Sequence, residues 1–155
     1  MSIKLLNEEI KTICELMDLT YIRATENEAN VDLDQQDTFK DFAIQIDQTI
    51  INVVQSEFGN YSYREFPIEI LFISANLTLD DKLQEVDEWI DQMEIQADTF
   101  YDKLIQSEIV DKNVVLPGYQ LDRLSGYKRF DTVLSGVQFT MDVPIPRLKY
   151  YCNGS

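Results

Sequence analysis

The feature that most constrains the fold is a series of apolar residues near the middle of the chain, spaced alternately four and three positions apart. This spacing keeps them on one side of an α-helix, so it predicts a long amphipathic helix from Leu79 to about Ser107. Thr78 followed by Asp81 matches a capping box at the start of this helix. The apolar stripe consists of Leu79, Leu83, Val86, Ile90, Met93, Ala97, Phe100 and Leu104.

Several segments before this helix have the composition of β-strands. Leu19 to Glu26 is rich in β-branched and aromatic residues, and Phe39 to Val54 predicts two strands or one bent strand. Glu57 to Asn60 is expected to close a hairpin, because its glycine and asparagine tolerate a positive φ. Tyr61 to Leu77 is apolar on both faces near its centre, as in a central strand of a sheet.

Proline and glycine residues are expected to interrupt the strands. Pro67 lies inside the expected central strand and cannot donate a ladder hydrogen bond, so we expect a bulge or an unpaired side there. After Pro117 we expect a strand, a turn at Ser125-Gly126 and a second strand that Pro144 and Pro146 stop. The second strand has Val137, Phe139, Met141 and Val143 on one face, which must be buried.

A first helix is expected from about Ile3 to Met17, because its apolar residues also recur at spacings of three and four. Together these elements predict one α+β domain over residues 1–155, with a short C-terminal tail from about residue 144. Its sheet is expected to be mainly antiparallel and packed against one long amphipathic helix and an N-terminal helix. The predicted core joins Val86, Ile90, Met93, Ala97 and Phe100 of the long helix to Ile68, Ile70, Phe72, Val137, Phe139 and Met141 of the sheet.

The residues that most enzymes use for acid-base and phosphate chemistry are missing from the chain. It contains no histidine, the commonest general base near neutral pH, and none of its five glycines belongs to a phosphate-binding loop. We therefore expect no enzymatic activity, no catalytic residue and no bound cofactor.

Metal sites are not predicted either. The chain has two cysteines, Cys14 and Cys152, and zinc would need further cysteine or histidine ligands. We interpret Cys14 as a buried apolar side chain and Cys152 as an unpaired tail thiol, with a structural disulfide as the alternative. Asp32, Asp34 and Asp37 loosely match a calcium loop but lack its central glycine and its final glutamate, which favours an exposed acidic loop.

Acidic residues dominate the charge of the chain, with 28 acidic and 13 basic side chains and a net charge of -15. Direct nucleic-acid binding is disfavoured, because phosphate contacts need clustered lysine and arginine. The net charge is -17 over residues 1–112 but +2 over residues 113–155. This asymmetry favours contacts between unlike surfaces of neighbouring protein copies.

No membrane segment is predicted, because apolar stretches such as Ile70 to Ile73 are far shorter than a bilayer span. No secretory signal is predicted either, because acidic residues interrupt the apolar residues near the N-terminus. We expect the chain to stay in the compartment where it is made.

Two stretches carry a resemblance to a known family: Asp18 to Asp37, and Arg129 to Ile145, which reads RFDTVLSGVQFTMDVPI. With the helix and strand order, they make the chain resemble the tail-terminator and tail-completion proteins of tailed bacteriophages. The resemblance implies a ring-forming structural subunit at the neck or tail end, which terminates or joins the tail. It implies a homo-oligomer, a hexamer or a larger ring, with neck, tail-tube or connector proteins as partners. The implied location is the virion, and the host cytoplasm during assembly.

The charge asymmetry predicts how such copies meet. Basic residues of the last hairpin and tail are expected to face acidic residues of the long helix on a neighbouring copy or on an adjoining virion protein. Ordinary surface charges are the alternative interpretation. The candidate interface residues are Arg123, Lys128, Arg129, Arg147 and Lys149 on the basic side, and Asp87, Asp91, Glu94 and Asp98 on the acidic side.

A second function from a different class is an acidic inhibitor that mimics DNA and occupies the basic groove of a nucleic-acid enzyme. The net charge of -15 and the acidic outer face of the long helix favour it. The basic final segment argues against it.

Overall fold

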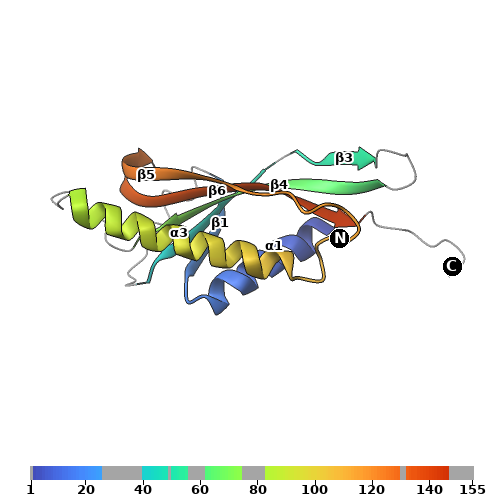
Figure 1. The fold of residues 1–155 in the computed structure, drawn as a ribbon, viewed down its shortest axis with the longest axis horizontal. Coiled ribbons are helices and arrows are strands. Elements are labelled where there is room, and N and C mark those ends of the chain that lie inside the picture. Colours follow the sequence, from blue (N-terminus) through green and yellow to red (C-terminus); the bar gives the residue numbers. More distant parts are fainter. Residues whose placement is uncertain are drawn as a thin grey trace, which may run out of the picture.

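The computed structural model describes residues 2–25, 40–48, 50–55, 62–74, 83–129 and 132–146. Within these residues the α+β class is confirmed. Helices α1 (Ser2–Leu16) and α3 (Leu83–Ile105) lie on the same side of a six-stranded sheet, as Figure 1 shows. The expected cap at Thr78, the hairpin turn at 57–60 and the acidic loop at 27–37 lie outside the described residues.

The sheet has the strand order β1-β2-β4-β6-β5, and β3 pairs with β4 beside this path. Its strands are β1 (Thr20–Ala24), β2 (Phe42–Ile46), β3 (Asn52–Gln55), β4 (Ser62–Ile73), β5 (Gln120–Arg129) and β6 (Thr132–Pro146). The pair β1–β2 is parallel and the other described pairs are antiparallel, so the sheet is mixed. A parallel pair needs a long crossover connection, and the chain between β1 and β2 is long enough for one.

The main core lies between the helices and the sheet. The stripe of α3, including Ile90, Met93 and Phe100, is buried in one cluster with the predicted residues of β4 and β6. The ring of Phe100 lies 5.5 Å from that of Phe72 and 5.4 Å from that of Phe139, centroid to centroid. These edge and tilted contacts suit aromatic rings. The predicted core is therefore confirmed, apart from Val86, whose side chain is outside the described set.

Helix α1 covers the part of the sheet next to β1 and β2. Its residues Leu6, Ile10 and Ile13 are buried, as the spacing predicted, and so is Cys14, but Ile3, which the same spacing placed on the buried stripe, is 41% exposed. Where α1 packs on β2, the buried side-chain amide of Gln45 donates a hydrogen bond to Asn7 Oδ1 at 2.9 Å and accepts one from the Tyr21 hydroxyl at 2.5 Å. These bonds satisfy the polar groups that the packing of α1 on the sheet removes from water.

A second buried cluster lies on the opposite face of the sheet. It consists of Ile22, Phe42, Ile44, Ile46, Leu71, Ile73 and Leu124. Because β4 contributes residues to both clusters, it is apolar on both faces, which confirms the prediction of a central strand.

The prolines of β6 do not stop the strand, so that prediction is wrong. β6 continues through Pro144 to Pro146, and Ile145 between them is buried in the main core. The Pro144 carbonyl accepts a hydrogen bond from the Asp111 N–H at 2.8 Å, so the backbone groups of Pro144 point away from β4. Its missing N–H therefore costs the β4–β6 ladder nothing, and the strand runs past residue 144, where the tail was expected to start, to Pro146.

Pro67 follows the same geometry on the other strand. Pro67 lies opposite Asp142 of β6, and Asp142 is two residues from Pro144. Because backbone groups of residues two apart in a strand point to the same side, the nitrogen of Pro67 also points away from β6. On that side, the pairing with β3 ends at Glu65 and the pairing with β2 ends at Glu69. Pro67 therefore lies in a gap between two partner strands, which confirms the expected unpaired side.

The turn expected at Ser125-Gly126 is also wrong, because β5 runs through it to Arg129. Leu124 pairs with Gly136 and Tyr127 pairs with Leu134, so two residues of β5 lie opposite one residue of β6. This is a β-bulge, which absorbs the serine and glycine inside the strand.

Candidate interaction surfaces

We searched the described residues for groups that could carry chemistry. They contain no group of three or more histidine, cysteine, aspartate or glutamate side chains that could hold a metal ion. Burial raises the pKa of the Cys14 thiol to about 12, which suppresses the nucleophilic thiolate at neutral pH. No helix in the described part of the chain is long and apolar enough to cross a bilayer.

The outer face of α3 carries the acidic candidates. Asp87, Asp91 and Asp98 are exposed, and Glu94 is half-buried. The helix period brings one set of exposed residues into a line on the side away from the sheet. This α3 stripe consists of Glu88, Asp91, Ile95, Asp98 and Asp102, and its single apolar member, Ile95, is 65% exposed.

Arg123 connects this helix to β5 within the same subunit. Its Nη2 atom lies 2.7 Å from Asp91 Oδ1, and its Nε atom lies 3.0 Å from Glu94 Oε1. The structure therefore brings three predicted interface residues together inside one copy. The side chains of Lys128 and Arg129 on β5, and residues Arg147 and Lys149, lie outside the described set.

Tyr119 holds a fourth candidate, Asp98. The Tyr119 hydroxyl donates a hydrogen bond to Asp98 Oδ1, and its ring stacks on Phe139 with centroids 5.1 Å apart. This hydrogen bond to a carboxylate, together with burial, raises the pKa of the Tyr119 hydroxyl to about 12. The start of β5 and the residue before it are thus linked to α3 through Arg123 and Tyr119.

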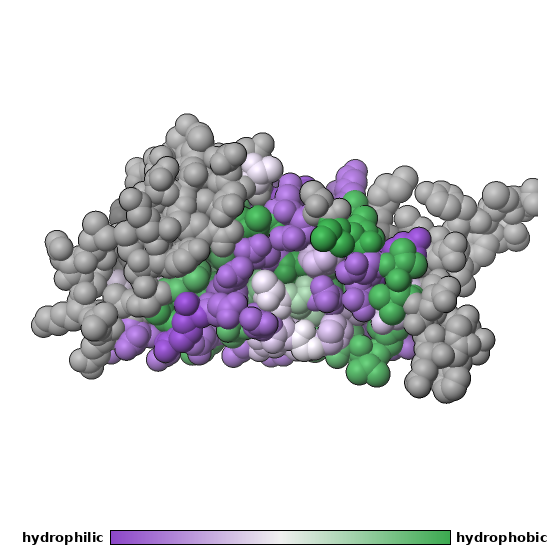
Figure 2. Space-filling view, turned by 90° about the horizontal axis from the view of Figure 1, so that it is seen from above, coloured by the Kyte–Doolittle hydropathy of each residue, from purple (hydrophilic) through white to green (hydrophobic). Residues whose placement is uncertain are grey.

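A group of exposed apolar side chains lies at the β3 end of the molecule. This apolar patch consists of Ile3, Ile50, Ile51 and Val53, which are 41%, 62%, 52% and 62% exposed. The first three line one cleft of about 70 Å³ together with Phe66 and Pro67. Figure 2 shows apolar groups in green toward this end of the described surface, beyond a polar middle region in purple.

A basic groove runs between α1 and the edge strand β1. It has a volume of about 470 Å³ and is lined by Ile3, Lys4, Asn7, Glu8, Lys11, Tyr21 and Arg23. Among the described residues, Lys4 forms a long, exposed pair with Glu8 at 3.9 Å, and Lys11 forms one with Glu15 at 4.0 Å. Arg23 lies 2.8 Å from Asp47. Such exposed pairs are weak, so these cations can accept other partners.

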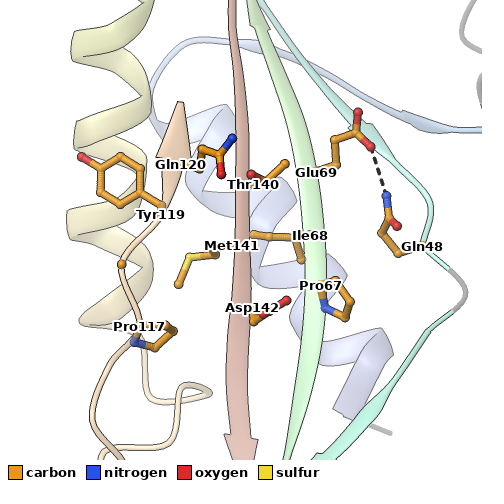
Figure 3. Close-up of a pocket in the computed structure, with 11 residues that line it drawn as sticks. Gln48, Pro67, Ile68, Glu69, Pro117, Tyr119, Gln120, Thr140, Met141 and Asp142 are labelled. Atoms are coloured by element: carbon orange, nitrogen blue, oxygen red, sulfur yellow. Dashed lines mark hydrogen bonds between the residues drawn. The ribbon is translucent and has the colours of Figure 1, made fainter. Parts of the chain in front are cut away.

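A polar groove of about 460 Å³ lies on the sheet where β5 leaves β6. Figure 3 shows Thr140, Asp142 and Pro67 around it, with Glu69 pointing toward Gln48. The Glu69 carboxylate accepts hydrogen bonds from the side-chain amides of Gln48 at 3.1 Å and Gln138 at 2.8 Å. Glu69, Gln48 and Gln138 can orient a polar partner by hydrogen bonds. Glu69 is bonded here to amides, which do not exchange protons near neutral pH, so these bonds do not form a general acid-base pair.

Sequence reasoning missed the apolar patch, the basic groove and the position of Ile95. Ile95 had a visible signal, because it is an aliphatic residue off the apolar stripe, between acidic residues of the outer face. The groove had none, because it forms only when Arg23 of β1 comes beside α1.

Comparison with protein-family models, with curated proteins and with solved structures finds no match to this chain.

Proposed function

We propose that this chain is a non-enzymatic structural subunit that forms a ring at the neck or tail end of a tailed bacteriophage, where it terminates or joins the tail. The observation that carries the proposal is the apolar patch of Ile3, Ile50, Ile51 and Val53. Exposed apolar groups that gather at one place on a soluble domain mark sites of protein contact. A copy of the same chain, or a neighbouring virion protein, would cover this patch.

Strand β3 supports the same proposal. Among the described strands it pairs only with β4, so no described strand covers its other edge. Such an edge can add a strand from a neighbouring molecule. The patch residue Val53 lies on this strand, so strand pairing and apolar burial would reinforce each other.

The proposed assembly is a homo-oligomer, a hexamer or a larger ring, without a bound cofactor. Its partners are neck, tail-tube or connector proteins, and it resides in the virion after assembly in the host cytoplasm. The proposal includes the fold expected of that family, a mainly antiparallel sheet packed against one long helix. The helix and strand order of the described residues fits this expectation.

Light scattering coupled to size-exclusion chromatography tests the proposal. The full chain should elute as a closed oligomer, and Ile51→Asp should shift it toward monomer while its circular dichroism stays native. Val115→Asp is the matched control, because Val115 is 95% exposed and is not part of the patch. A chain that stays monomeric at all concentrations and is absent from purified virions would contradict the proposal.

The α3 stripe favours one alternative, the acidic mimic of DNA. Its carboxylates extend from Glu88 to Asp102, about 21 Å along the helix axis at 1.5 Å per residue. However, Ile95 interrupts the stripe and Arg123 neutralises part of it. Salt-sensitive competition with DNA for a nuclease or polymerase would support the mimic, and failure to compete at low salt would exclude it.

A further inference from the structure

We infer that the α3 stripe of one copy docks into the basic groove of the next copy, with Ile95 seated between the lysines of α1. This inference rests on the proposed assembly into a ring and names the surfaces that would build it. Both surfaces consist of described residues, and they lie on different elements of the fold.

The α3 stripe has the composition of a contact surface with one anchor. Ile95 is 65% exposed, and Asp91 and Asp98 lie one turn before and one turn after it. The Arg123 and Tyr119 bonds both use the Oδ1 atom of these aspartates. A carboxylate accepts further hydrogen bonds through its second oxygen, so both aspartates are fixed in place and can still bind a cation of a partner.

The basic groove matches this pattern in charge. Within a chain of net charge -15, the lining of the groove has three cations, Lys4, Lys11 and Arg23, and one carboxylate, Glu8. Glu15 and Asp47 lie beside the lining and form exposed pairs with Lys11 and Arg23, and docking would exchange these pairs for pairs with the stripe. Ile3 and Tyr21 add apolar walls that can receive an isoleucine side chain. The acidic stripe and the basic groove therefore complement each other in sign and in apolar content.

The two surfaces also match in spacing. Lys4 and Lys11 are two helical turns apart on α1, and Asp91 and Asp98 are two turns apart on α3, about 10 Å in each case. Ile95 lies between the aspartates, as Asn7 lies between the lysines. Two helices side by side can thus place both lysine–aspartate pairs and the apolar anchor at one contact.

A contact between unlike surfaces leaves a free stripe at one end and a free groove at the other. Copies joined in this way continue head to tail until the rotation between them closes a ring. The proposed docking does not use Arg123 across the interface, since this arginine pairs with Asp91 and Glu94 of its own chain.

The first test compares two substitutions on α3. Ile95→Arg places a cation against the basic groove, so assembly followed by analytical ultracentrifugation at low salt should weaken about tenfold or more. Gln92→Arg is the matched control, because Gln92 is exposed on the same helix but lies outside the stripe. Circular dichroism and thermal melting verify that both variants stay folded.

The second test exchanges the charges. Lys4→Glu/Lys11→Glu and Asp91→Lys/Asp98→Lys should each assemble poorly alone, because each loses the attraction at one surface. An equimolar mixture should assemble again, since the wild-type stripe of the first meets the wild-type groove of the second and the reversed surfaces also attract. If Asp91→Lys/Asp98→Lys does not fold, the comparison of Ile95→Arg with Lys4→Glu/Lys11→Glu decides instead.

The outcomes separate this inference from the proposed function. Restored assembly of the mixture, or loss of assembly in Ile95→Arg and Lys4→Glu/Lys11→Glu but not in Gln92→Arg, supports the docking. An oligomer that Ile95→Arg leaves intact, but that reversal of Lys128 and Arg129 to Glu dissociates, overturns the docking and keeps the ring. A wild-type chain that never assembles overturns both.

Discussion

Arg123 Nη2 of β5 lies 2.7 Å from Asp91 Oδ1 of α3, so this ion pair links the last hairpin to the long helix within one subunit. Its Nε atom also binds Glu94 at 3.0 Å. Both acidic partners and the arginine itself are partly exposed to solvent, which screens their attraction.

The first prediction concerns this link. Arg123→Ala should lower the free energy of unfolding by about 0.5 to 1 kcal/mol at low salt, as for an exposed pair, and by less at high salt. Urea unfolding at two ionic strengths measures this effect. Lys103→Ala is the control, because Lys103 is an exposed cation in the last turn of α3. Equal losses in the two variants would contradict a role for the ion pair.

The second prediction uses two isoleucines of the same helix. Ile90→Asp should unfold the subunit, because Ile90 is 1% exposed and a carboxylate there would be buried without a partner. The expected loss exceeds about 4 kcal/mol, which is large for a single substitution. Ile95→Asp should leave the fold intact, because its side chain points to solvent. Circular dichroism and thermal melting of both variants give the comparison, and a folded Ile90→Asp protein would show that the assigned helix face is wrong.

The third prediction concerns the close approach of two strands at Gly136. A Cβ atom at this position would lie 2.0 Å from the carbonyl oxygen of Phe72, far inside van der Waals contact. Gly136→Ala should therefore push β6 away from β4 and lower the free energy of unfolding by about 1 to 3 kcal/mol or more, the usual cost of overpacking.

Gly118→Ala is the matched control, because a Cβ atom at Gly118 would have no neighbour within 4 Å. Denaturant midpoints of the two variants measure the difference. A Gly136→Ala protein as stable as Gly118→Ala would show that the strands separate at no cost.

Local periodicity explains why the main core could be predicted from sequence. The stripe of Ile90, Met93 and Phe100 and the alternation of Val137, Phe139 and Met141 depend only on the helix and strand repeats, which are properties of neighbouring residues. Their burial against one another followed from the need of each apolar face for a partner layer.

The errors have a common cause in long-range pairing. Whether Pro144 ends a strand depends on whether its backbone groups point toward the partner strand. The hydrogen bond from the Asp111 N–H to the Pro144 carbonyl shows that they point away from it. Whether Ser125-Gly126 forms a turn or a bulge depends on the register against β6. The parallel pairing of β1 with β2 likewise depends on the path of the connection. None of these is encoded in the local pattern.

The candidate site shows the same division. The acidic outer face of α3 was visible in the sequence, because the apolar residues are spaced alternately four and three positions apart and the carboxylates lie between them, off the apolar stripe. The internal pairing of Arg123 was not, since it requires β5 to lie beside α3. The interface roles of Lys128, Arg129, Arg147, Lys149 and Asp87 remain predictions.

The last prediction is a pH dependence centred on Tyr119. The hydrogen bond to Asp98, with burial, raises the pKa of its hydroxyl from 10.0 to about 12. The folded state therefore holds this proton more tightly than the unfolded state does. The contribution to stability is complete below pH 10, and it is lost as the pH rises through 12. The hydroxyl has the lower pKa in the unfolded chain, so it ionises there first, and this ionisation stabilises the unfolded state relative to the folded state.

Tyr119→Phe removes this proton and the bond to Asp98 but keeps the ring that stacks on Phe139. Its melting temperature should be lower than that of the wild type at pH 8, and the difference should shrink between pH 10 and 12. Tyr63→Phe is a useful comparison, because the pKa of Tyr63 is also raised, by burial and by Glu65, but at a site away from α3. A gap between wild type and Tyr119→Phe that stays constant from pH 8 to 12 would show that the Asp98 bond does not control this titration, whereas a gap that closes for Tyr119→Phe whether or not Tyr63→Phe is also present locates the effect at the contact between α3 and the segment leading into β5.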